Sequence, residues 1–367
     1  MSTPQRLAAA GALLVAIATA AFAAFPAAAA AQFTPEELAN IRVYETVNKS
    51  VVHITTSTVQ VDPIFGRAIP GEGAGSGCVL DKEGHILTNN HVIEGARQVV
   101  VAFSDDRTYN AQIVGRDEEY DIAVLKIDAK PETLDPIELG RSEGLRVGQK
   151  AFALGNPFGL DGTLTTGIVS SLNRSLPSRT DGSVMTGMIQ TDAAMNPGNS
   201  GGPLLDSSAE MIGMCVAIRS SVGQNSGVGF AIPVDRVRRF VPELIRHGRI
   251  LRAYHGIVQV SETPQGLRVW RVSDGSPADA AGLRGMRIVE RRWREGAILY
   301  REREIDRDYA DLIAAVDGQP VKTHTEFIDI MDGYKPGDRV VFTVVRDGSR
   351  VDIPVTLSAT EPRTARR

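Results

Sequence analysis

Ser200 lies in a glycine-rich segment whose composition suits a catalytic nucleophile, Asn196-Pro-Gly-Asn-Ser-Gly-Gly-Pro203. A nucleophilic serine needs an accessible oxygen and nearby backbone N–H groups that stabilise an oxyanion. Glycines on both sides let the backbone turn tightly and leave room for a substrate. Because the loop must aim two N–H groups at one point, we expect Gly198 and Ser200 to supply the oxyanion donors. On its own, the segment fits an ordinary glycine-rich turn equally well.

A general base and an acid are the groups that would make Ser200 a nucleophile. His91 lies at the end of an apolar strand-like run, in Leu87-Thr-Asn-Asn-His-Val-Ile93, and Asp121 begins another, in Tyr120-Asp-Ile-Ala-Val-Leu-Lys126. Strand ends hold side chains rigidly, which the base and its carboxylate partner require. His91 is one of six histidines, and its setting and its order along the chain distinguish it. We therefore predict a catalytic triad of His91, Asp121 and Ser200.

The segment around Ser200 also satisfies the Gly-x-Ser-x-Gly pattern of the α/β-hydrolases. That fold needs a helix directly after the serine, with the acid and the histidine later in the chain. Here Gly201, Gly202 and Pro203 follow the serine and oppose a helix. The order histidine, aspartate, serine is that of the chymotrypsin type. This order excludes a lipase or esterase.

The sequence between Val51 and Ile232 predicts many short strands, and these strands must position the three triad residues. Frequent short strands separated by turn residues predict an all-β sandwich or pair of barrels. The predicted strands include Val51–Thr58, Gln98–Phe103, Ala123–Ile127, Ala151–Leu154 and Ile212–Ile218.

An amphipathic helix is predicted to close this first domain. Apolar residues from Val237 to Ile245 recur on one helical face, Pro233 suits the start, and Gly248 suits the end. Pro242 lies inside the pattern and predicts a kink. After a boundary at Arg249–Arg252, residues 253–358 read as a small mixed α/β domain with helices at Pro277–Ala281 and Thr325–Met331.

Length and charge bound the possible functions. The chain has 367 residues, which favours two folded domains, and a formal net charge of −4 with a pI of about 5.9. This charge argues against a general binder of nucleic acid or anionic membrane. The two cysteines, Cys78 and Cys215, match no zinc-site spacing and are too few for a disulfide scaffold. They either form one disulfide bridge or are two small buried hydrophobes.

The N-terminus predicts export. Arg6 precedes an uncharged, alanine-rich stretch from Leu7 to Ala31 that ends in small residues. Residues 1–31 therefore read as a secretory signal peptide, and an uncleaved membrane anchor is the alternative. Either reading predicts the periplasm or another exported compartment, with anchoring in the inner membrane as the second case. Residues 359–367 are expected to form a disordered tail.

Eight motifs in residues 33–248 together resemble the HtrA/Deg serine proteases and occur in that family's order. They are Gly75-Ser-Gly-Cys-Val79, Ile86-Leu-Thr-Asn-Asn-His-Val-Ile-Glu-Gly95, Asp121-Ile-Ala-Val-Leu-Lys-Ile127, Gly155-Asn-Pro-Phe-Gly-Leu160, Thr165-Thr-Gly-Ile-Val-Ser170, Ile189-Gln-Thr-Asp-Ala-Ala194, Asn196–Leu204 and Gly227-Val-Gly-Phe-Ala-Ile-Pro233. The resemblance implies a trypsin-like domain of two six-stranded β-barrels that uses no cofactor. It implies cleavage of unfolded or damaged proteins, and a homotrimer or higher multiple with contacts near Phe33.

The second domain resembles the PDZ module that follows the protease in this family. The similar motifs are Tyr254-His-Gly-Ile257, Gly275-Ser-Pro-Ala-Asp-Ala-Ala-Gly-Leu283 and Ala315-Val-Asp-Gly-Gln-Pro-Val321. Such a domain adds a peptide as an extra strand and holds its terminal carboxylate with backbone N–H groups. The resemblance implies that the donors are in His255, Gly256 and Ile257.

Several positions depart from the family pattern or carry two readings. His255 and Cys215 stand where the family usually has an apolar residue and an asparagine. The insertion between Leu283 and Asp311 is rich in Arg and Glu, and reads as a solvated loop or as a regulatory contact. Asp192 has two interpretations, either a structural carboxylate or part of a pocket for basic residues. Met195 is expected to contribute to an apolar specificity pocket.

The sequence also leaves an alternative overall function. In this alternative the chain is a chaperone or PDZ binding protein whose protease is dormant.

Overall fold

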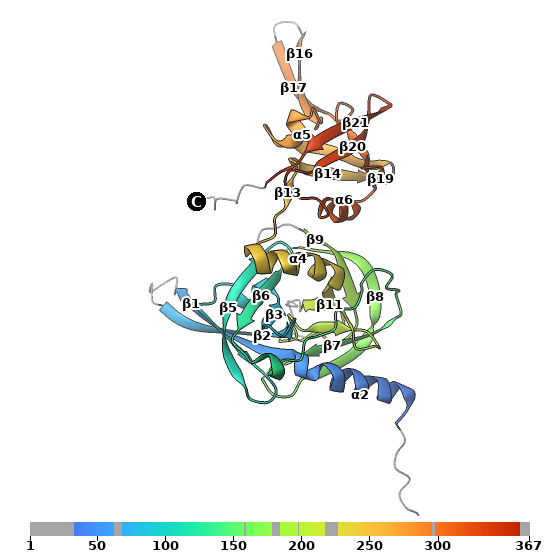
Figure 1. The fold of residues 1–367 in the computed structure, drawn as a ribbon. Coiled ribbons are helices and arrows are strands. Elements are labelled where there is room, and N and C mark those ends of the chain that lie inside the picture. Colours follow the sequence, from blue (N-terminus) through green and yellow to red (C-terminus); the bar gives the residue numbers. More distant parts are fainter. Residues whose placement is uncertain are drawn as a thin grey trace, which may run out of the picture.

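The computed structural model describes residues 33–61, 68–157, 159–177, 184–196, 198–216, 227–295 and 298–359. They form a pair of β-barrels followed by a smaller sheet-and-helix domain (Figure 1). The predicted signal peptide and most of the predicted tail lie outside the described residues. Among the described helices, none is both long enough and apolar enough to cross a membrane.

The first barrel closes on itself in the strand order β1-β2-β3-β6-β5-β4. The strands are β1 (Val51–Val61), β2 (Ala68–Val79), β3 (His85–Thr88), β4 (Gln98–Ala102), β5 (Thr108–Asp117) and β6 (Ile122–Ile127). Among the short helices, η1 (Asn48–Ser50) precedes β1, α3 (Asn90–Ile93) connects β3 to β4, and η2 (Pro131–Thr133) follows β6. Ile54, Ile86 and Leu125 are fully buried inside this barrel.

The second barrel repeats the closed arrangement in the order β10-β11-β12-β9-β8-β7. Its strands are β7 (Lys150–Gly155), β8 (Thr163–Pro177), β9 (Val184–Thr191), β10 (Pro203–Leu205), β11 (Met211–Val216) and β12 (Gly229–Pro233). Small residues such as Ala151, Ala153 and Ala231 fill its interior together with Met195. The predicted double six-stranded barrel of chymotrypsin type is therefore confirmed.

A third apolar cluster joins the two barrels and seats the helix that follows them. Leu87 and Ile122 of the first barrel pack in it with Phe152 and Leu154 of the second, and with Phe240 of helix α4 (Val234–His247). Burying large apolar side chains at about 25 cal/mol per Å² makes this junction a main source of stability. Helix α2 (Pro35–Val47) lies on the opposite side of the two barrels from α4 (Figure 1), and Thr34 caps it with Glu37 in a capping box.

The predicted closing helix is α4 (Val234–His247), and it ends at Gly248 in the left-handed conformation, with φ 71°. Glycine suits that position because it has no Cβ to clash. Pro242 lies within the helix, which continues past it to His247. The linker Arg249–Arg252 then leads to the second domain.

The second domain is a PDZ-like sheet in the order β14-β15-β18-β20-β21, with β19 paired to β18. The elements are β13 (Ala253–Tyr254), β14 (Ile257–Thr263), β15 (Gly266–Val272), α5 (Pro277–Ala280), β18 (Leu312–Val316), β19 (Gln319–Pro320), α6 (His324–Met331), β20 (Arg339–Arg346), β21 (Ser349–Thr356) and β22 (Ser358–Ala359). Both predicted helices are present. Phe327 of α6 and Phe342 of β20 are buried in its core, so the predicted mixed α/β fold is confirmed.

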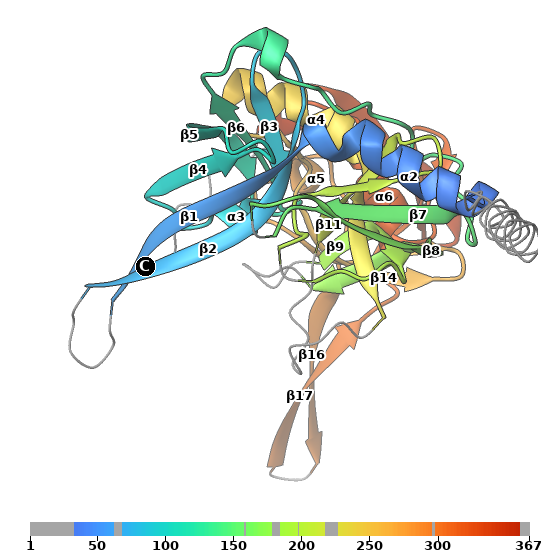
Figure 2. The same ribbon diagram turned by 90° about the horizontal axis from the view of Figure 1, so that it is seen from below.

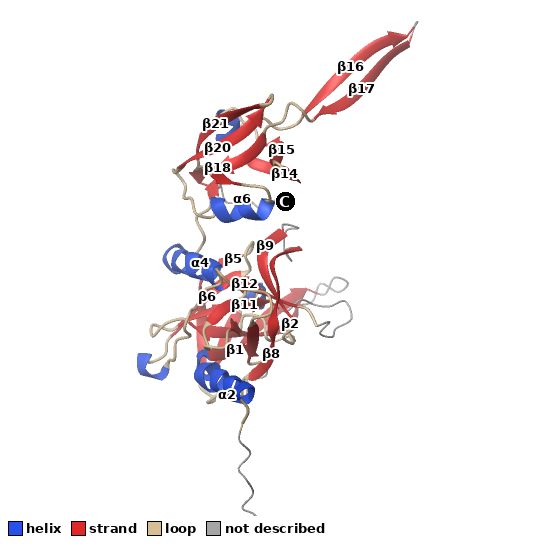
Figure 3. Ribbon diagram, turned by 90° about the vertical axis from the view of Figure 1, so that its right-hand side faces the viewer, coloured by secondary structure: helices blue, strands red, loops and turns tan. Residues whose placement is uncertain are grey.

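The charged insertion forms a long β-hairpin and not the solvated loop that we considered. Strands β16 (Arg287–Glu295) and β17 (Ile298–Asp306) pair antiparallel along their whole length. The hairpin projects away from the rest of the domain (Figure 2 and Figure 3). Trp293 stacks on Tyr300 directly across the ladder, with ring centroids 5.4 Å apart. Such cross-strand pairs stabilise a hairpin, and the abundance of charge concealed this pattern.

Candidate active site

His91 and Asp121 form a closely held pair between the first barrel's strands. The Nδ1 atom of His91 lies 2.6 Å from Oδ2 of Asp121, and the backbone N–H of His91 donates to Oδ1 at 2.8 Å. One carboxylate therefore fixes both the ring and the backbone of the histidine. With Nδ1 donating to the carboxylate, Nε2 is the nitrogen that can accept a proton.

Asp121 holds this position in a strained backbone conformation. Its φ is 54°, in the left-handed region that costs most L-residues about 1–2 kcal/mol. Its carbonyl oxygen accepts hydrogen bonds from the backbone N–H of Asn90 at 3.2 Å and from the side chain of Asn89 at 3.0 Å. These bonds come from the segment that carries His91, so the strain and the pairing are maintained together.

The loop that carries Ser200 packs directly on the strands that lead to His91. A Cβ on Gly201 would lie 2.2 Å from the Ser76 carbonyl oxygen and 2.5 Å from the Thr88 hydroxyl oxygen. Only glycine permits this approach, and Gly201 also has a φ of 84°. The Ser200 carbonyl accepts the N–H of Ser76 at 2.8 Å. The loop that carries Ser200 therefore packs against the end of β3 that leads to His91, and Ser200 is 6% exposed.

Ser76, on β2 of the first barrel, links the predicted oxyanion loop to the residue that follows β7 of the second barrel. Its hydroxyl donates to the Gly198 carbonyl oxygen at 2.5 Å and accepts the N–H of Asn156 at 2.8 Å. Gly198 has a φ of 103°, and a Cβ there would lie 2.4 Å from Pro157. The N–H of Asn199 is used within the loop, donating to the Asn196 carbonyl. The predicted oxyanion donors are the N–H groups of Gly198 and Ser200, on either side of Asn199.

Asp192 and Met195, two positions near the Ser200 loop, both make contacts within the second barrel. The carboxylate of Asp192 accepts the N–H of Ile168 at 2.7 Å, which favours the structural reading over a pocket for basic residues. Met195 is buried in the apolar cluster of the second barrel. A Cβ on Gly229 would lie 2.5 Å from Met195 Cγ, so that glycine makes room for the methionine.

Cys78 and Cys215 are free and buried, so they are two small buried hydrophobes and do not form a disulfide bridge. The backbone of Cys215 pairs with the loop after Ser200, accepting the N–H of Gly201 and donating to the carbonyl of Gly202. The Cys78 thiol lies 3.7 Å from the Gly201 carbonyl. Burial raises the pKa of both thiols, so they act as neutral packing groups under this loop.

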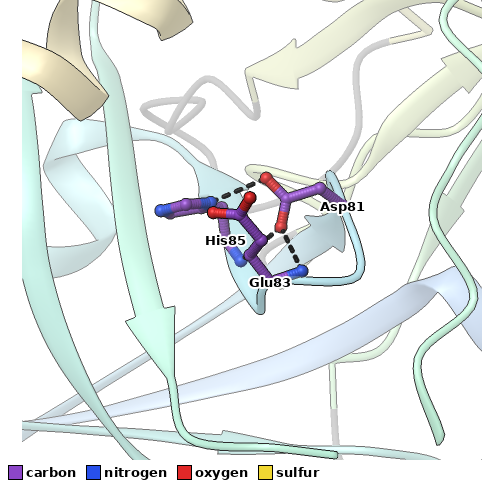
Figure 4. A group of neighbouring side chains, drawn as sticks. All are labelled: Asp81, Glu83 and His85. Atoms are coloured by element: carbon purple, nitrogen blue, oxygen red, sulfur yellow. Dashed lines mark hydrogen bonds and ion pairs between the residues drawn. The ribbon is translucent and has the colours of Figure 1, made fainter. Parts of the chain in front are cut away.

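A second histidine–aspartate pair in the first barrel has the same distance between Nδ1 and Oδ2 as the pair of His91 and Asp121, but it has a different role (Figure 4). The Nδ1 atom of His85 lies 2.6 Å from Asp81 Oδ2, and Glu83 stands beside them. Asp81 also accepts the backbone N–H groups of Glu83 and His85, so it braces the turn between β2 and β3. Burial acts to raise the pKa of Asp81, but these hydrogen bonds lower it. The role of Asp81 in stabilising this turn therefore explains why Asp81, Glu83 and His85 lie together.

Comparison with known proteins identifies the family. Residues 75–214 match the trypsin-like peptidase domain family and residues 256–357 the PDZ domain family. The chain is 42% identical over 94% of its length to Protease Do-like 1, chloroplastic, of Arabidopsis thaliana, and covers 79% of that protein. It belongs to the HtrA/Deg family of serine proteases.

Other relatives agree with this assignment. The putative serine protease HhoA of Synechocystis sp. is 35% identical over 83% of this chain and 80% of its own. The solved structure of the HtrA-type protease AlgW with decapeptide superposes with a TM-score of 0.70 at 32% identity, covering 88% of this chain and 99% of that one. The chain is accordingly a serine endopeptidase with one PDZ domain.

The PDZ domain of this protease contacts the residue that precedes Asp121. The hydroxyl of Tyr120 donates to Asp332, at the end of α6, with oxygen–oxygen distances of 2.6 and 2.7 Å. Arg236 of α4 pairs with Asp329 of α6 at 3.1 Å. The Tyr120 ring stacks on Phe240 with centroids 4.9 Å apart. The PDZ and protease domains therefore meet at Tyr120, one residue before Asp121 of the predicted triad.

The linker strengthens the same contact. Arg252 forms a bidentate pair with Asp117, with nitrogen–oxygen distances of 2.6 and 2.7 Å, and its guanidinium lies over the Tyr120 ring. Asp117 in turn accepts the backbone N–H of Tyr120 at 2.8 Å. Neither Ser76 nor Tyr120 was singled out from the sequence, because their roles arise from contacts with distant segments. Their only signal was position, because Ser76 lies inside the Gly75–Val79 motif and Tyr120 directly precedes the motif that begins at Asp121.

We expect Ser76→Ala to lower kcat by about 10–100-fold, because the loop of Gly198 loses the hydroxyl that links it to Asn156. Steady-state peptidase kinetics should show the loss in kcat, while thermal denaturation shows a folded protein. Ser207→Ala, at an exposed serine, is the matched control and should keep the parent activity. An unchanged kcat in Ser76→Ala would show that the hydroxyl does not position the loop.

Proposed function

We propose that the protease cleaves unfolded or damaged exported proteins through an acyl-enzyme, with His91, Asp121 and Ser200 as its triad. The main observation behind this proposal is the pair of hydrogen bonds between His91 and Asp121. The Ser200 loop packs close to the same segment, which only a glycine at position 201 allows. The proposal extends to the PDZ domain, which captures peptide C-termini as an added strand. No metal or other cofactor takes part in it.

The proposed chemistry follows from these positions. Ser200 Oγ attacks the scissile carbonyl carbon while His91 Nε2 accepts the hydroxyl proton. The oxyanion that forms is stabilised by the N–H groups of Gly198 and Ser200, each worth about 3–4 kcal/mol in the transition state. His91 then gives its proton to the leaving amine, and a water molecule releases the acyl group from Ser200 by the reverse sequence. Asp121 keeps the ring oriented throughout.

Export and assembly belong to the same proposal. Relatives are named chloroplastic proteases or probable periplasmic endoproteases, and the alanine-rich N-terminus of this chain supports an exported location. We propose a homotrimer as the basic assembly. Phe33 is 58% exposed and Leu38 is 53% exposed, so the start of α2 offers apolar surface for contacts between subunits.

The Tyr120–Asp332 contact supports regulated activity over a permanently dormant protease. A ligand on the PDZ domain that changes how α6 sits would act on Tyr120, and hence on the strained backbone at Asp121. Such coupling needs only a difference in ligand affinity between docked and undocked arrangements. The alternative function is a protein whose protease is always dormant. Such a protein would not need its PDZ domain to contact Tyr120, next to Asp121.

We expect Ser200→Ala to abolish cleavage of casein, with a loss in kcat on the order of 10⁶. Casein is chosen because it lacks a stable fold, and product peptides can be followed by gel electrophoresis. Ser207→Ala should cleave at the parent rate. Undiminished cleavage by Ser200→Ala would remove the proposed nucleophile.

The interdomain contact should tighten as the pH falls through about 6. Burial raises the pKa of Asp332 from 3.8 to about 6, against the lowering effects of the Tyr120 hydrogen bond and nearby Arg236, Arg252 and Arg239. The docked arrangement therefore binds a proton more tightly than an undocked one, where the group is exposed. Between pH 7.5 and 5.5 this linkage corresponds to about a fourfold gain in the docking equilibrium.

Energy transfer between dyes on Val147→Cys and Ser349→Cys, two exposed positions on the two domains, would measure this docking. The docked fraction should rise at the lower pH in the parent protein. It should stay constant in Asp332→Asn, which cannot titrate there. An equal rise in both proteins would assign the pH dependence to another group.

A further inference from the structure

The edge of the PDZ sheet and helix α6 form the two walls along which a peptide strand would add. Strand β14 ends the described sheet and pairs only with β15 there, so its outer edge is open to a further strand. Helix α6 packs beside it, and the N–H of His324 donates to Glu262 of β14 at 2.8 Å. The loop Tyr254–Ile257 stands at the start of β14, where the terminal carboxylate of such a strand would arrive.

The side chain of His255 occupies this loop. Its ring lies edge-on against Phe327 of α6, with centroids 5.3 Å apart and planes at 82°, and its other neighbour is the ring of Tyr254. The His255 backbone carbonyl accepts the N–H of Ala278 at 2.9 Å. The imidazole is therefore held between the carboxylate loop and α6.

One of the three predicted carboxylate donors is already used by this ring. The backbone N–H of Ile257 donates to Nδ1 of His255 at 2.9 Å. A backbone N–H can only donate, so Nδ1 carries no proton and the neutral ring has its proton on Nε2. Burial lowers the pKa of His255 to about 4, with a smaller effect from His324, so the ring keeps this acceptor at neutral pH.

The same loop cannot move aside easily. Gly256 has a φ of 88°, and a Cβ there would lie 2.0 Å from the hydroxyl oxygen of Ser276. Its carbonyl accepts the N–H of Ser273 at 2.8 Å. The backbone around His255 is thus fixed on both sides, and only the imidazole is left to rotate.

We propose that His255 is a specificity-determining residue of the peptide site, because its imidazole competes with a peptide's terminal carboxylate for the Ile257 N–H. This inference rests on the peptide-binding role proposed above. A terminal carboxylate must displace the ring to gain its third hydrogen bond. Free C-termini therefore bind this domain more weakly than they would with an apolar residue at position 255.

Two substitutions distinguish the effect of the Nδ1 acceptor of His255 from the effect of the size of its side chain. His255→Leu removes the acceptor and keeps an apolar side chain, whereas His255→Asn keeps an acceptor close to the position of Nδ1. A hydrogen bond to a charged group contributes enough that we expect His255→Leu to bind a free carboxylate at least about tenfold more tightly. His255→Asn should bind like the parent.

The measurement is fluorescence anisotropy with the full chain carrying Ser200→Ala, which prevents cleavage of the probe. The probe is a fluorescein-labelled decapeptide that ends in a free Val carboxylate, compared with the same peptide as its C-terminal amide. We expect the tenfold gain in His255→Leu for the acid peptide only, with circular dichroism showing that all variants are folded.

Three results would overturn the inference. Equal or weaker binding of the acid peptide by His255→Leu would show that the ring does not compete. An equal gain for the amide peptide, or the same gain in His255→Asn, would place the effect outside the carboxylate contact. No binding of either peptide by any variant would remove the peptide-binding role itself, and the inference with it.

Discussion

The pairing of His91 with Asp121 is the interaction on which the rest of the site depends. It requires Asp121 in a left-handed backbone conformation, which the hydrogen bonds from Asn89 and Asn90 compensate. The segment that supplies those bonds also carries the base, so neither residue can be displaced without the other. Within the buried junction of the barrels, this arrangement keeps the imidazole in the one tautomer that serves a serine nucleophile.

The nucleophile loop meets this pair through close backbone contacts that only glycine allows. Gly201 lies against the Ser76 carbonyl and the Thr88 hydroxyl, and the Ser76 side chain connects the loop to Asn156. The first barrel therefore positions the proposed base, the second barrel carries the proposed nucleophile, and Ser76 links the two barrels. Because Tyr120 precedes Asp121 and contacts Asp332, the PDZ domain contacts the segment that carries Asp121.

Local patterns predicted what depends on local physics. Alternating apolar runs predicted the strands, the stripe ending at Gly248 predicted α4, and the surrounding motifs predicted the trypsin-like and PDZ domains. Contacts between distant segments left no such pattern. The Ser76 and Tyr120 contacts are of this kind, as is the bond of the His255 ring to Ile257. The β16–β17 hairpin was missed because its charges suggested solvation, although alternation and the Trp293–Tyr300 pair stabilise a ladder.

Labelling by a fluorophosphonate probe tests most directly whether the triad activates Ser200. The probe reacts with a serine whose proton is removed by a positioned base, so the account predicts a single adduct that mass spectrometry assigns to Ser200. The adduct should disappear in His91→Ala, while circular dichroism shows an intact fold. A folded parent protein that takes no label at Ser200, with or without an added C-terminal peptide, would contradict the account.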